Sequence, residues 1–596
     1  DVGLLDLSQR FQLVARSEVA EQALYLWAFN HLQNRAAALF NLRGVPVTVP
    51  KSKFTLTVPE HKSARRQHGR RQKAHTSRMD AAALRTTMKL RAAAAMSAYT
   101  RADAHSTVAM ISLTAPAALD AHRAPLDILC VIDRSGSMSG EKMALMRQTL
   151  GLLVSRAGLS SADKVGIVSF STEATTELPL TRMDGAGLSR AKKVVEGLRA
   201  GGGTNLSGGL LQGLQMLVDS AGGGEECATA TRCVLLFTDG QANGGIMNPA
   251  DIVLAAQGAL AGSPTQIFSF GFGASHNEDL LLSLSRATLG QYYFLKEAEA
   301  IPAAFADCLG GLVSVVAQNA TLSLRPTGGR HACAALGQLL GDAYASTTAE
   351  DGSIAVRLGD LFSEDEKDVL LELKLPPMPA GGAAGQQDQA TAAETAAEGV
   401  EGWTLVDGAE AADDGDAGGV EGTPAASGAE GKCATDAVVA LTATLRFFSV
   451  LSKRFEEVHT QLWISRPEDA RAATVNHKVD EQANRTAVAA AIKQATRVAD
   501  RGDVGQGRAL LQAALGALAR SPSAASSVSQ ALSADVQRLA VDYEHLGSYR
   551  SVGSKRSKMS AMSHSYQRST HDEEMPSHYA AGSESKGSMK RGWSHP

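Results

Sequence analysis

Two acidic residues and three hydroxyl residues are spaced along the chain so that they could share one divalent metal ion. Asp133, Ser135 and Ser137 alternate within the stretch DRSGSMSG, and Asp239 lies in LLFTDGQ. Thr204 lies between them in the glycine-rich stretch GGGTNL. Two carboxylates with three hydroxyls make an oxygen-only ligand set of low charge, which suits Mg²⁺ or Mn²⁺ better than Ca²⁺. Such an ion keeps water molecules that an outside ligand can displace.

Each of these stretches alone is an ordinary turn sequence. Their positions relative to the predicted strands and helices are what indicates a shared site. Residues 126–132 (LDILCVI) are almost continuously apolar, as expected for a strand buried on both faces, and Asp133 follows directly. Asp239 follows a second apolar strand, and Thr204 precedes a predicted helix. In doubly wound sheets, ligands bind at the carboxyl ends of the strands. We therefore expect the five residues to meet at one point.

Strands and helices are predicted to alternate through the middle of the chain. Alternation at this spacing indicates βαβ units and an α/β fold with a doubly wound, mostly parallel sheet. The predicted strands lie at 106–114, 126–132, 164–171, 233–238, 265–272 and 291–295. The predicted helices lie at 139–157, 187–199, 205–220, 249–261, 277–288 and 297–313.

Four stretches of this region resemble one known family: VIDRSGSMSGEKM, KVGIVSFST, GGGTNLSGGL and LLFTDG. They are similar to the von Willebrand factor A domains that carry a metal-ion-dependent adhesion site. The resemblance covers residues 125–314 and implies a Rossmann-like, doubly wound fold. It also implies that the five residues named above hold the metal, and that an Asp or Glu carboxylate from a protein partner completes the coordination.

The flanking sequences resemble an intracellular group within this family. Residues 310–324 and 354–376 are similar to the β region that follows the A domain in that group, 485–515 to its helical VWA-interacting region, and 557–570 to its C-terminal segment. In plants the group includes E3 ubiquitin ligases with a RING finger before the A domain. The closely spaced Cys and His ligands of a RING are not found in the given sequence, so the resemblance does not carry ligase activity over.

The resemblance and the composition together divide the chain into parts. An acidic linker rich in Ala and Gly, and a tail rich in Ser, Lys and Arg, carry too few apolar residues to bury a core, so we expect both to be disordered. The basic stretch 61–75 is either a targeting signal or a solvated loop. The parts are 1–80 (helical and basic, without an assigned role), 81–124 (a lead-in with a strand for the β domain), 125–314 (the A domain), 315–375 with 433–465 (a β-rich domain), 376–432 (the acidic linker), 478–546 (the helical VWA-interacting region) and 547–596 (the tail).

Composition excludes several function classes. The chain of 596 residues has a net charge of −4, which is atypical of proteins that bind nucleic acid. No apolar run approaches the length of a transmembrane helix. The six cysteines are scattered, without a C-x-x-C pair, which argues against a zinc ribbon or a disulfide scaffold and favours a reducing compartment. We expect an intracellular protein, in the cytoplasm or the nucleus.

We do not expect an enzyme. Catalysis by the metal would need a base beside the bound water, and the nearest candidates, Glu141 and Lys142, are predicted to be solvated charges on the following helix. The main hypothesis is a module that binds an acidic side chain of a partner protein through Mg²⁺ or Mn²⁺. The alternatives are a component of the ubiquitin pathway and a secreted adhesion protein. The identity of the partner and the oligomeric state stay open.

Overall fold

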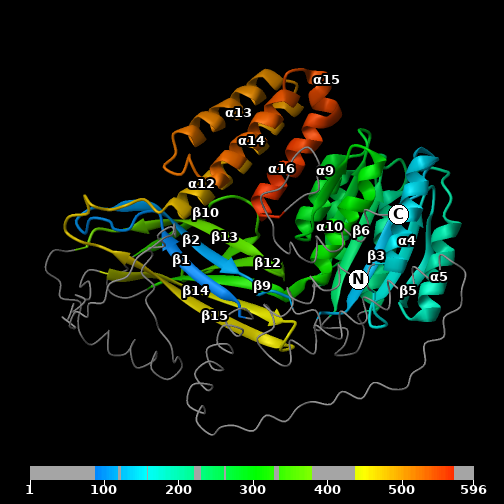
Figure 1. Cartoon of the computed structure of the whole chain (residues 1–596), viewed down its shortest axis with the longest axis horizontal. Helices are drawn as coiled ribbons and strands as arrows, with labels where there is room; N and C mark the ends of the chain where they lie inside the picture. The colour runs from blue at the N-terminus through cyan, green and yellow to red at the C-terminus, as the bar shows by residue number, and fades with distance from the viewer. Residues whose placement is uncertain are drawn as a thin grey trace, which may run out of the picture. The chain divides into compact units, whose positions relative to one another are not determined.

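The apolar runs of the sequence form the central strands of a six-stranded sheet in the computed structural model (Figure 1). Every residue of the strands over 126–133, 231–238 and 266–272 is buried, which is the pattern of strands covered on both faces. The edge strand β5 runs antiparallel to β4, and the other neighbours are parallel. In spatial order the strands are β5 (Ala174–Arg182), β4 (Lys164–Phe170), β3 (Leu126–Asp133), β6 (Thr231–Thr238), β7 (Gln266–Phe272) and β8 (Tyr292–Leu295).

Helices cover both faces of this sheet. Cys130 and Ile132 of β3 pack on one side, whereas Leu129 and Val131 pack on the other, because successive side chains of a strand point to opposite faces. The predicted α/β fold with a doubly wound, mostly parallel sheet is confirmed. The first face is covered by α4 (Glu141–Arg156), α5 (Gly185–Gly197) and α10 (Ile301–Val313), and the second by α6 (Leu206–Ser220), α8 (Pro249–Ala259) and α9 (Glu278–Ala287). Two single 3₁₀ turns, η1 (Gly136–Met138) and η2 (Ala298–Ala300), complete this part.

The edge strand β5 is not among the strands predicted from the sequence. Its residues ATTELPLTR include Pro179, and Leu178 is the buried residue of the strand. Proline lacks a backbone donor and is tolerated in a sheet mainly at an edge. The same composition that suits the edge position hides the strand from a search for apolar alternation.

The structure describes part of the chain, and some of the predicted segments lie outside the described residues. The predicted segment 1–80 and the linker from residue 379 onward are not among the described residues. Within the described ranges, no helix has the length and hydropathy needed to cross a membrane. All described residues belong to one unit, Ser77–Pro596. They are residues 87–118, 123–156, 159–220, 230–260, 263–327, 334–378 and 437–568.

A second domain is a sandwich of two antiparallel sheets with one shared apolar core. Alternating residues of its strands, such as Ile111, Leu322 and Leu371, point into that core, as expected for strands buried on one face. In spatial order, the four-stranded sheet contains β1 (Lys89–Ala94), β2 (His105–Thr114), β13 (Glu366–Leu375) and β10 (Ala335–Leu339). The five-stranded sheet contains β11 (Ser346–Thr348), β12 (Ile354–Phe362), β9 (Val315–Pro326), β14 (Ala437–Ser449) and β15 (Arg454–Ser465).

Helices form the C-terminal part of the described chain. Three of them begin at capping side chains: Asn476, Asp503 and Ser526 each accept a hydrogen bond from the backbone N–H three residues further on, which satisfies a donor that the helix leaves unpaired. The helices are α12 (His477–Asp500), α13 (Val504–Ala519), α14 (Ser527–Asp542), α15 (Leu546–Ser548), the π-helical turn η3 (Tyr549–Gly553) and α16 (Ser554–Tyr566).

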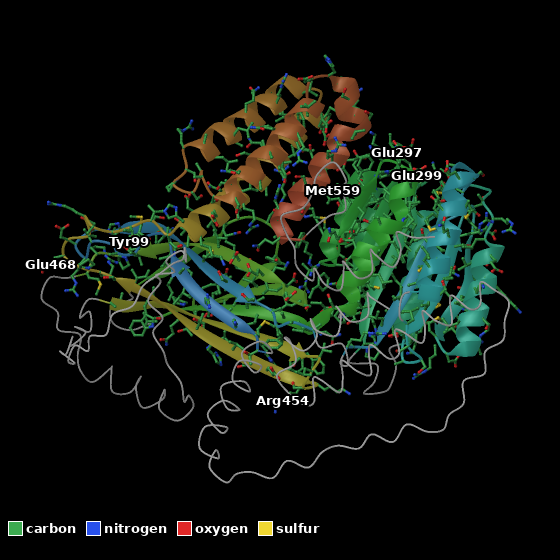
Figure 2. All side chains as sticks on the ribbon, in the orientation of Figure 1. Tyr99, Glu297, Glu299, Arg454, Glu468 and Met559 are labelled. Carbon is green, nitrogen blue, oxygen red and sulfur yellow. The ribbon has the colours of Figure 1, made fainter. Side chains whose placement is uncertain are left out.

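The helix α16 corrects the prediction that residues 547–596 form a disordered tail. It is almost entirely buried, and Met559 lies where α16 meets the sheet domain (Figure 2), with its Sδ atom 3.5 Å from the backbone N of Phe294. Serine is small enough for close packing between helices, and the buried Lys555 and Lys558 pair with carboxylates. Composition alone therefore gave the wrong expectation. Residues from 569 onward lie outside the described chain.

Candidate metal centre

The carboxylate of Asp133 is fixed at the carboxyl end of β3. It is fully buried. Its Oδ1 accepts a hydrogen bond of 2.8 Å from the backbone N–H of Ser135, and its Oδ2 accepts one of 2.6 Å from the Thr238 hydroxyl. Burial raises the pKa of Asp133, these hydrogen bonds lower it, and the charge of Asp239 raises it further. A cation beside Asp133 would offset this unfavourable burial of negative charge.

Ser135, Ser137 and Asp239 form a continuous chain of polar contacts next to Asp133. The single turn η1 brings the two serine hydroxyls to 3.0 Å from each other. The hydroxyl of Ser137 then donates a hydrogen bond of 2.7 Å to Oδ1 of Asp239, which follows β6. Because β3 and β6 are adjacent and parallel, the carboxyl ends of both strands supply this cluster, as the sequence predicts.

Thr204 reaches the same cluster from the glycine-rich loop. The hydroxyls of Thr204 and Ser137 both lie next to Gly240. A Cβ atom built on this glycine would be 3.8 Å from Oγ1 of Thr204 and 3.9 Å from Oγ of Ser137. The loop turns sharply because Gly202 adopts φ +91°, a conformation that other residues rarely take. The side chain of Asn243 fixes the loop, since its Oδ1 accepts a hydrogen bond of 2.7 Å from the Thr204 backbone N–H.

Lys142 also enters this cluster, which corrects the expectation that it is a solvated charge. Its ammonium group forms an ion pair with Oδ2 of Asp239 and lies 3.4 Å from the carbonyl oxygen of Ser137. The side chain of Lys142 is 37% exposed, so the ammonium contacts both the carboxylate and solvent. A positive charge therefore already lies against one of the two carboxylates.

The residues present fit a hard divalent ion. Among the described residues, no three His, Cys, Asp or Glu side chains are placed so that they could hold a metal ion, so a metal site at this point depends on hydroxyl oxygens as well as carboxylates. Two carboxylates and three hydroxyls converge here, and an oxygen-rich set of this kind suits Mg²⁺ or Mn²⁺. The residues that would hold the ion are Asp133, Ser135, Ser137, Thr204 and Asp239.

Two residues with a role in this geometry were missed by the sequence analysis, and the contact made by a third, Lys142, was not predicted. Thr238 orients the carboxylate of Asp133, Asn243 fixes the loop of Thr204, and Lys142 contacts Asp239. Thr238 and Asn243 lie within five residues of Asp239, which is the one sequence signal that could have drawn attention to them. The contact of Lys142 depends on the direction of α4, which spacing along the chain does not specify.

His276 has a structural environment rather than a catalytic one. It is buried, and its Nε2 lies 2.7 Å from the hydroxyl of Tyr292. Burial lowers the pKa of His276 to about 4, which keeps the imidazole neutral at physiological pH. A Cβ atom on Gly271 would lie only 2.4 Å from the imidazole ring. The glycine of β7 therefore leaves the space that the ring of His276 occupies.

Comparisons with known proteins identify the family of the domain that carries this cluster. Residues 127–307 match the family model described as von Willebrand factor type A domain. Over 258 residues the chain is 31% identical to E3 ubiquitin-protein ligase WAV3 of Arabidopsis thaliana, which covers 43% of this chain and 31% of that protein. Over 151 residues it is 34% identical to the inter-alpha-trypsin inhibitor heavy chain H4 of Homo sapiens, which covers 25% of this chain and 16% of that protein. The chain thus spans less than a third of either relative.

A solved structure shows the same fold. The structure described as von Willebrand factor type A from Catenulispora acidiphila matches with a TM-score of 0.53 and 16% identity, over 74% of this chain and 88% of that one. At this identity the match concerns the fold alone. The share of this chain that it covers is larger than the part matched by the family model. Residues 127–307 of this chain are a von Willebrand factor type A (VWA) domain.

Proposed function

We propose that this VWA domain binds an acidic side chain of a partner protein through one divalent metal ion. VWA domains are protein-interaction modules, and the finer assignment depends on the candidate metal centre. The observation that carries it is the contact chain from the hydroxyl of Ser135 through Ser137 to the carboxylate of Asp239, with Asp133 and Thr204 beside it. Five oxygen donors at one point are the donor set that Mg²⁺ or Mn²⁺ takes in proteins.

The charge balance of the site favours an anionic partner. Asp133 and Asp239 bring two negative charges, Lys142 brings one positive charge, and the three hydroxyls are neutral. When bound, a divalent ion supplies a positive centre with an open coordination position. The five donors hold it in place, and a carboxylate of a partner is the ligand that suits the remaining position.

We also propose that this site binds without turnover. General acid–base catalysis needs a titratable side chain within hydrogen-bond reach of the reacting group. Lys142 is engaged by Asp239, and the buried imidazole of His276 contacts Tyr292 on a different part of the sheet. Neither side chain offers the site a free base.

Metal titration of the whole chain tests the first part of this proposal. Isothermal titration with MgCl₂ and MnCl₂ should show one bound ion per chain. Asp133→Asn and Asp239→Asn should each abolish the binding, because each removes one of two charged ligands, whereas Ser135→Ala should weaken it less. Asp251→Asn, an exposed carboxylate in the first turn of α8, is the matched control. Wild-type affinity in either of the first two variants would contradict the assignment of the site.

Capture of partner proteins tests the second part. Partners that depend on the site should be lost with EDTA, recovered with Mg²⁺ and absent with Asp239→Asn. Replacing the contacting Asp of such a partner by Asn should mimic the loss. Hydrolysis of a peptide or phosphoester by the purified chain, lost in Asp133→Asn, would overturn a binding site without turnover.

The similarity to E3 ubiquitin-protein ligase WAV3 supports a second candidate, a role in the ubiquitin pathway. The matched region of WAV3 includes less than a third of that protein, so its named activity is a proposal for this chain. One observation bears on the compartment: the described Cys130 and Cys233 are buried thiols outside any disulfide, which suits a reducing environment. Incubation with ubiquitin, E1, E2 and ATP distinguishes the candidates, since an interaction module alone should form no ubiquitin conjugates.

A further inference from the structure

A cavity of about 510 Å³ lies between the VWA domain and the sandwich, away from the candidate metal centre. The VWA side of its wall includes the start of β7 and the end of α9, and the sandwich side includes parts of β9, β12 and β15. Asp360 and Arg357 are the charged residues among those that line it. Leu260, Leu289 and Phe455 provide apolar walls.

The carboxylate of Asp360 is buried in this wall and forms no ion pair with a side chain that the structure describes. The residue is 5% exposed. Its Oδ1 accepts a hydrogen bond of 3.1 Å from the backbone N–H of Asn319. The guanidinium of Arg568 donates to the backbone carbonyl of Asp360 rather than to its carboxylate. Burial raises the pKa of Asp360, and the nearby charge of Arg568 lowers it only in part. Burying a carboxylate this way is costly unless a cation or several donors compensate it.

The local backbone is arranged around this carboxylate. Gly359 adopts φ +78° and Asn319 adopts φ +55°, and the register of β12 with β9 shifts on both sides of Gly359. Bulges of this kind redirect a side chain from the regular face of a strand. The bulge therefore accounts for how Asp360 comes to line the cavity.

The side chain of Gln266 adds a second unsatisfied polar group. Gln266 is 3% exposed, and its Oε1 atom has no hydrogen-bond partner among the residues that the structure describes. Its amide lies beside the bulge, since a Cβ atom on Gly359 would be 3.8 Å from Nε2. Rotation of the amide by half a turn exchanges its oxygen and nitrogen. Gln266 can therefore present a hydrogen-bond acceptor next to Asp360.

We propose that this cavity binds a ligand group with one positive charge and several hydrogen-bond donors, an alkylammonium or a guanidinium group. The carboxylate of Asp360 and the amide of Gln266 receive the donors, and Leu289, Leu260 and Phe455 contact the alkyl stem. Arg357 in the wall and Arg568 beside Asp360 repel further positive charge, so a single cationic group suits the cavity better than a polyamine. The group comes either from a Lys or Arg side chain of a partner protein or from a free amine.

Calorimetric titration of the whole chain tests this proposal with defined probes. The probes are n-butylammonium chloride and Nα-acetyl-lysine N-methylamide, and the neutral comparisons are 1-butanol and Nα-acetyl-norleucine N-methylamide. Each cationic probe should bind about tenfold more tightly than its neutral comparison. Tighter binding of the lysine derivative would assign the cavity to a protein side chain, and tighter binding of butylammonium would assign it to a free amine.

Two variants show whether the probes occupy this cavity. Asp360→Asn keeps an acceptor for the Asn319 N–H but removes the charge, and it should weaken the cationic probes about tenfold. Thr321→Phe fills the cavity from strand β9 and should weaken all probes. Asp469→Asn, an exposed carboxylate 64% accessible to solvent, should change nothing. The proposal fails if the cationic probes do not bind, or if their affinity is the same in Asp360→Asn and in folded Thr321→Phe as in wild type.

Discussion

At the scale of single residues, the ammonium group of Lys142 opposes the binding of a cation at the candidate metal centre. It contacts the carboxylate of Asp239 and so neutralises part of the negative charge that would otherwise attract a metal ion. Lys142→Ala should therefore increase the affinity for Mg²⁺, by about threefold to tenfold because solvent screens a partly exposed charge. Isothermal titration at two salt concentrations measures this effect.

The control for Lys142 is Lys193→Ala, which removes an exposed charge from α5 in the same domain. This variant should leave the affinity for Mg²⁺ unchanged. If Lys142→Ala instead weakened Mg²⁺ binding, the ammonium would be supporting the ligand geometry rather than competing with the ion.

The buried carboxylate of Asp360 should make stability depend on pH. Burial raises its pKa from 3.8 to about 6, so the folded state binds more protons than the unfolded state between these values. Stability should fall as pH rises through this window, and the loss is complete above about pH 6. Asp360→Asn should thus be more stable than wild type by about 2–3 kcal/mol at pH 8 and by little at pH 4.

Urea unfolding at both pH values measures this difference, with Asp469→Asn as the exposed control. Equal stabilisation of Asp360→Asn at the two pH values would show that the carboxylate is not titrating between 4 and 6. The measurement needs no ligand, so it is independent of the titrations with ammonium probes.

The sequence was sufficient to predict which residues gather at the candidate metal centre, but not what holds them. Asp133, Ser135 and Asp239 were found because residues at the ends of neighbouring parallel strands must lie close together. Thr238 and Asn243 act through single hydrogen bonds across the site. Their directions depend on loop conformations, which the order of residue types does not encode.

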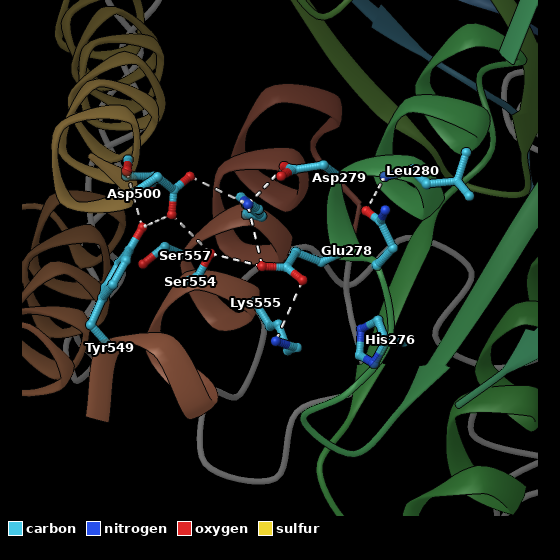
Figure 3. A network of polar contacts seen from close by, with 12 residues as sticks. His276, Glu278, Asp279, Leu280, Asp500, Tyr549, Ser554, Lys555 and Ser557 are labelled. Carbon is cyan, nitrogen blue, oxygen red and sulfur yellow. Dashed lines mark hydrogen bonds and ion pairs between the residues drawn. The ribbon is translucent and has the colours of Figure 1, made fainter. Parts of the chain in front are cut away.

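At the scale of elements, α16 connects the helices with the VWA domain through a buried network of charges. Figure 3 shows Glu278 and Asp279 of α9 facing Asp500 of α12, and Lys555 lies beside them. Lys558 lies between these carboxylates, 3.4 Å from Glu278, 2.7 Å from Asp279 and 3.4 Å from Asp500. One ammonium group therefore neutralises carboxylates from two separate helices.

Removing Lys558 should destabilise the protein, because it leaves uncompensated carboxylates at a buried contact. We expect Lys558→Met to lower the free energy of unfolding by about 2–3 kcal/mol, less than for a fully enclosed pair since Asp279 is exposed. Urea unfolding measures the change, and Lys193→Met on the exposed face of α5 is the control. A loss of less than about 0.5 kcal/mol would mean that solvent already satisfies these charges.

Composition failed for α16 for a physical reason. A segment rich in Ser and Lys has little apolar area to bury, so by itself it should not fold. In the structure, Met559 and Met562 pack into the core of the VWA domain, and the lysines meet carboxylates contributed by other elements. The helix α16 is stabilised by its contacts with other elements, and the composition of the segment itself does not predict these contacts.

At the scale of the whole molecule, the VWA domain is an insertion in the sandwich. Strands β1 and β2 precede it, and β9 to β15 follow it. Strand β2 pairs with β13 in a register that joins Ile111 to Val369. The sequence predicts the VWA fold from local alternation, but a pairing across more than 250 residues has no local signature. The sandwich was therefore predicted as a β-rich region without its topology.

Both connections of the insertion are held at the turn between β12 and β13. The entering segment bonds there through the Ala115 N–H and the Asp365 carbonyl, at 2.8 Å. The leaving segment bonds there through the Ser314 carbonyl and the Ser363 N–H, at 2.7 Å. Asp133 lies at the opposite end of β3 from the entering connection.

This arrangement has a mechanical consequence. Tension applied by a partner pulling at Asp133 would run lengthwise through β3 to the anchored turn. Strand β3 lies in the middle of the sheet, between β4 and β6. A force along β3 would therefore act in shear on the hydrogen bonds to both neighbours at once, instead of breaking them one after another. If a partner binds as proposed, a pull on it would therefore load both ladders of β3 at once.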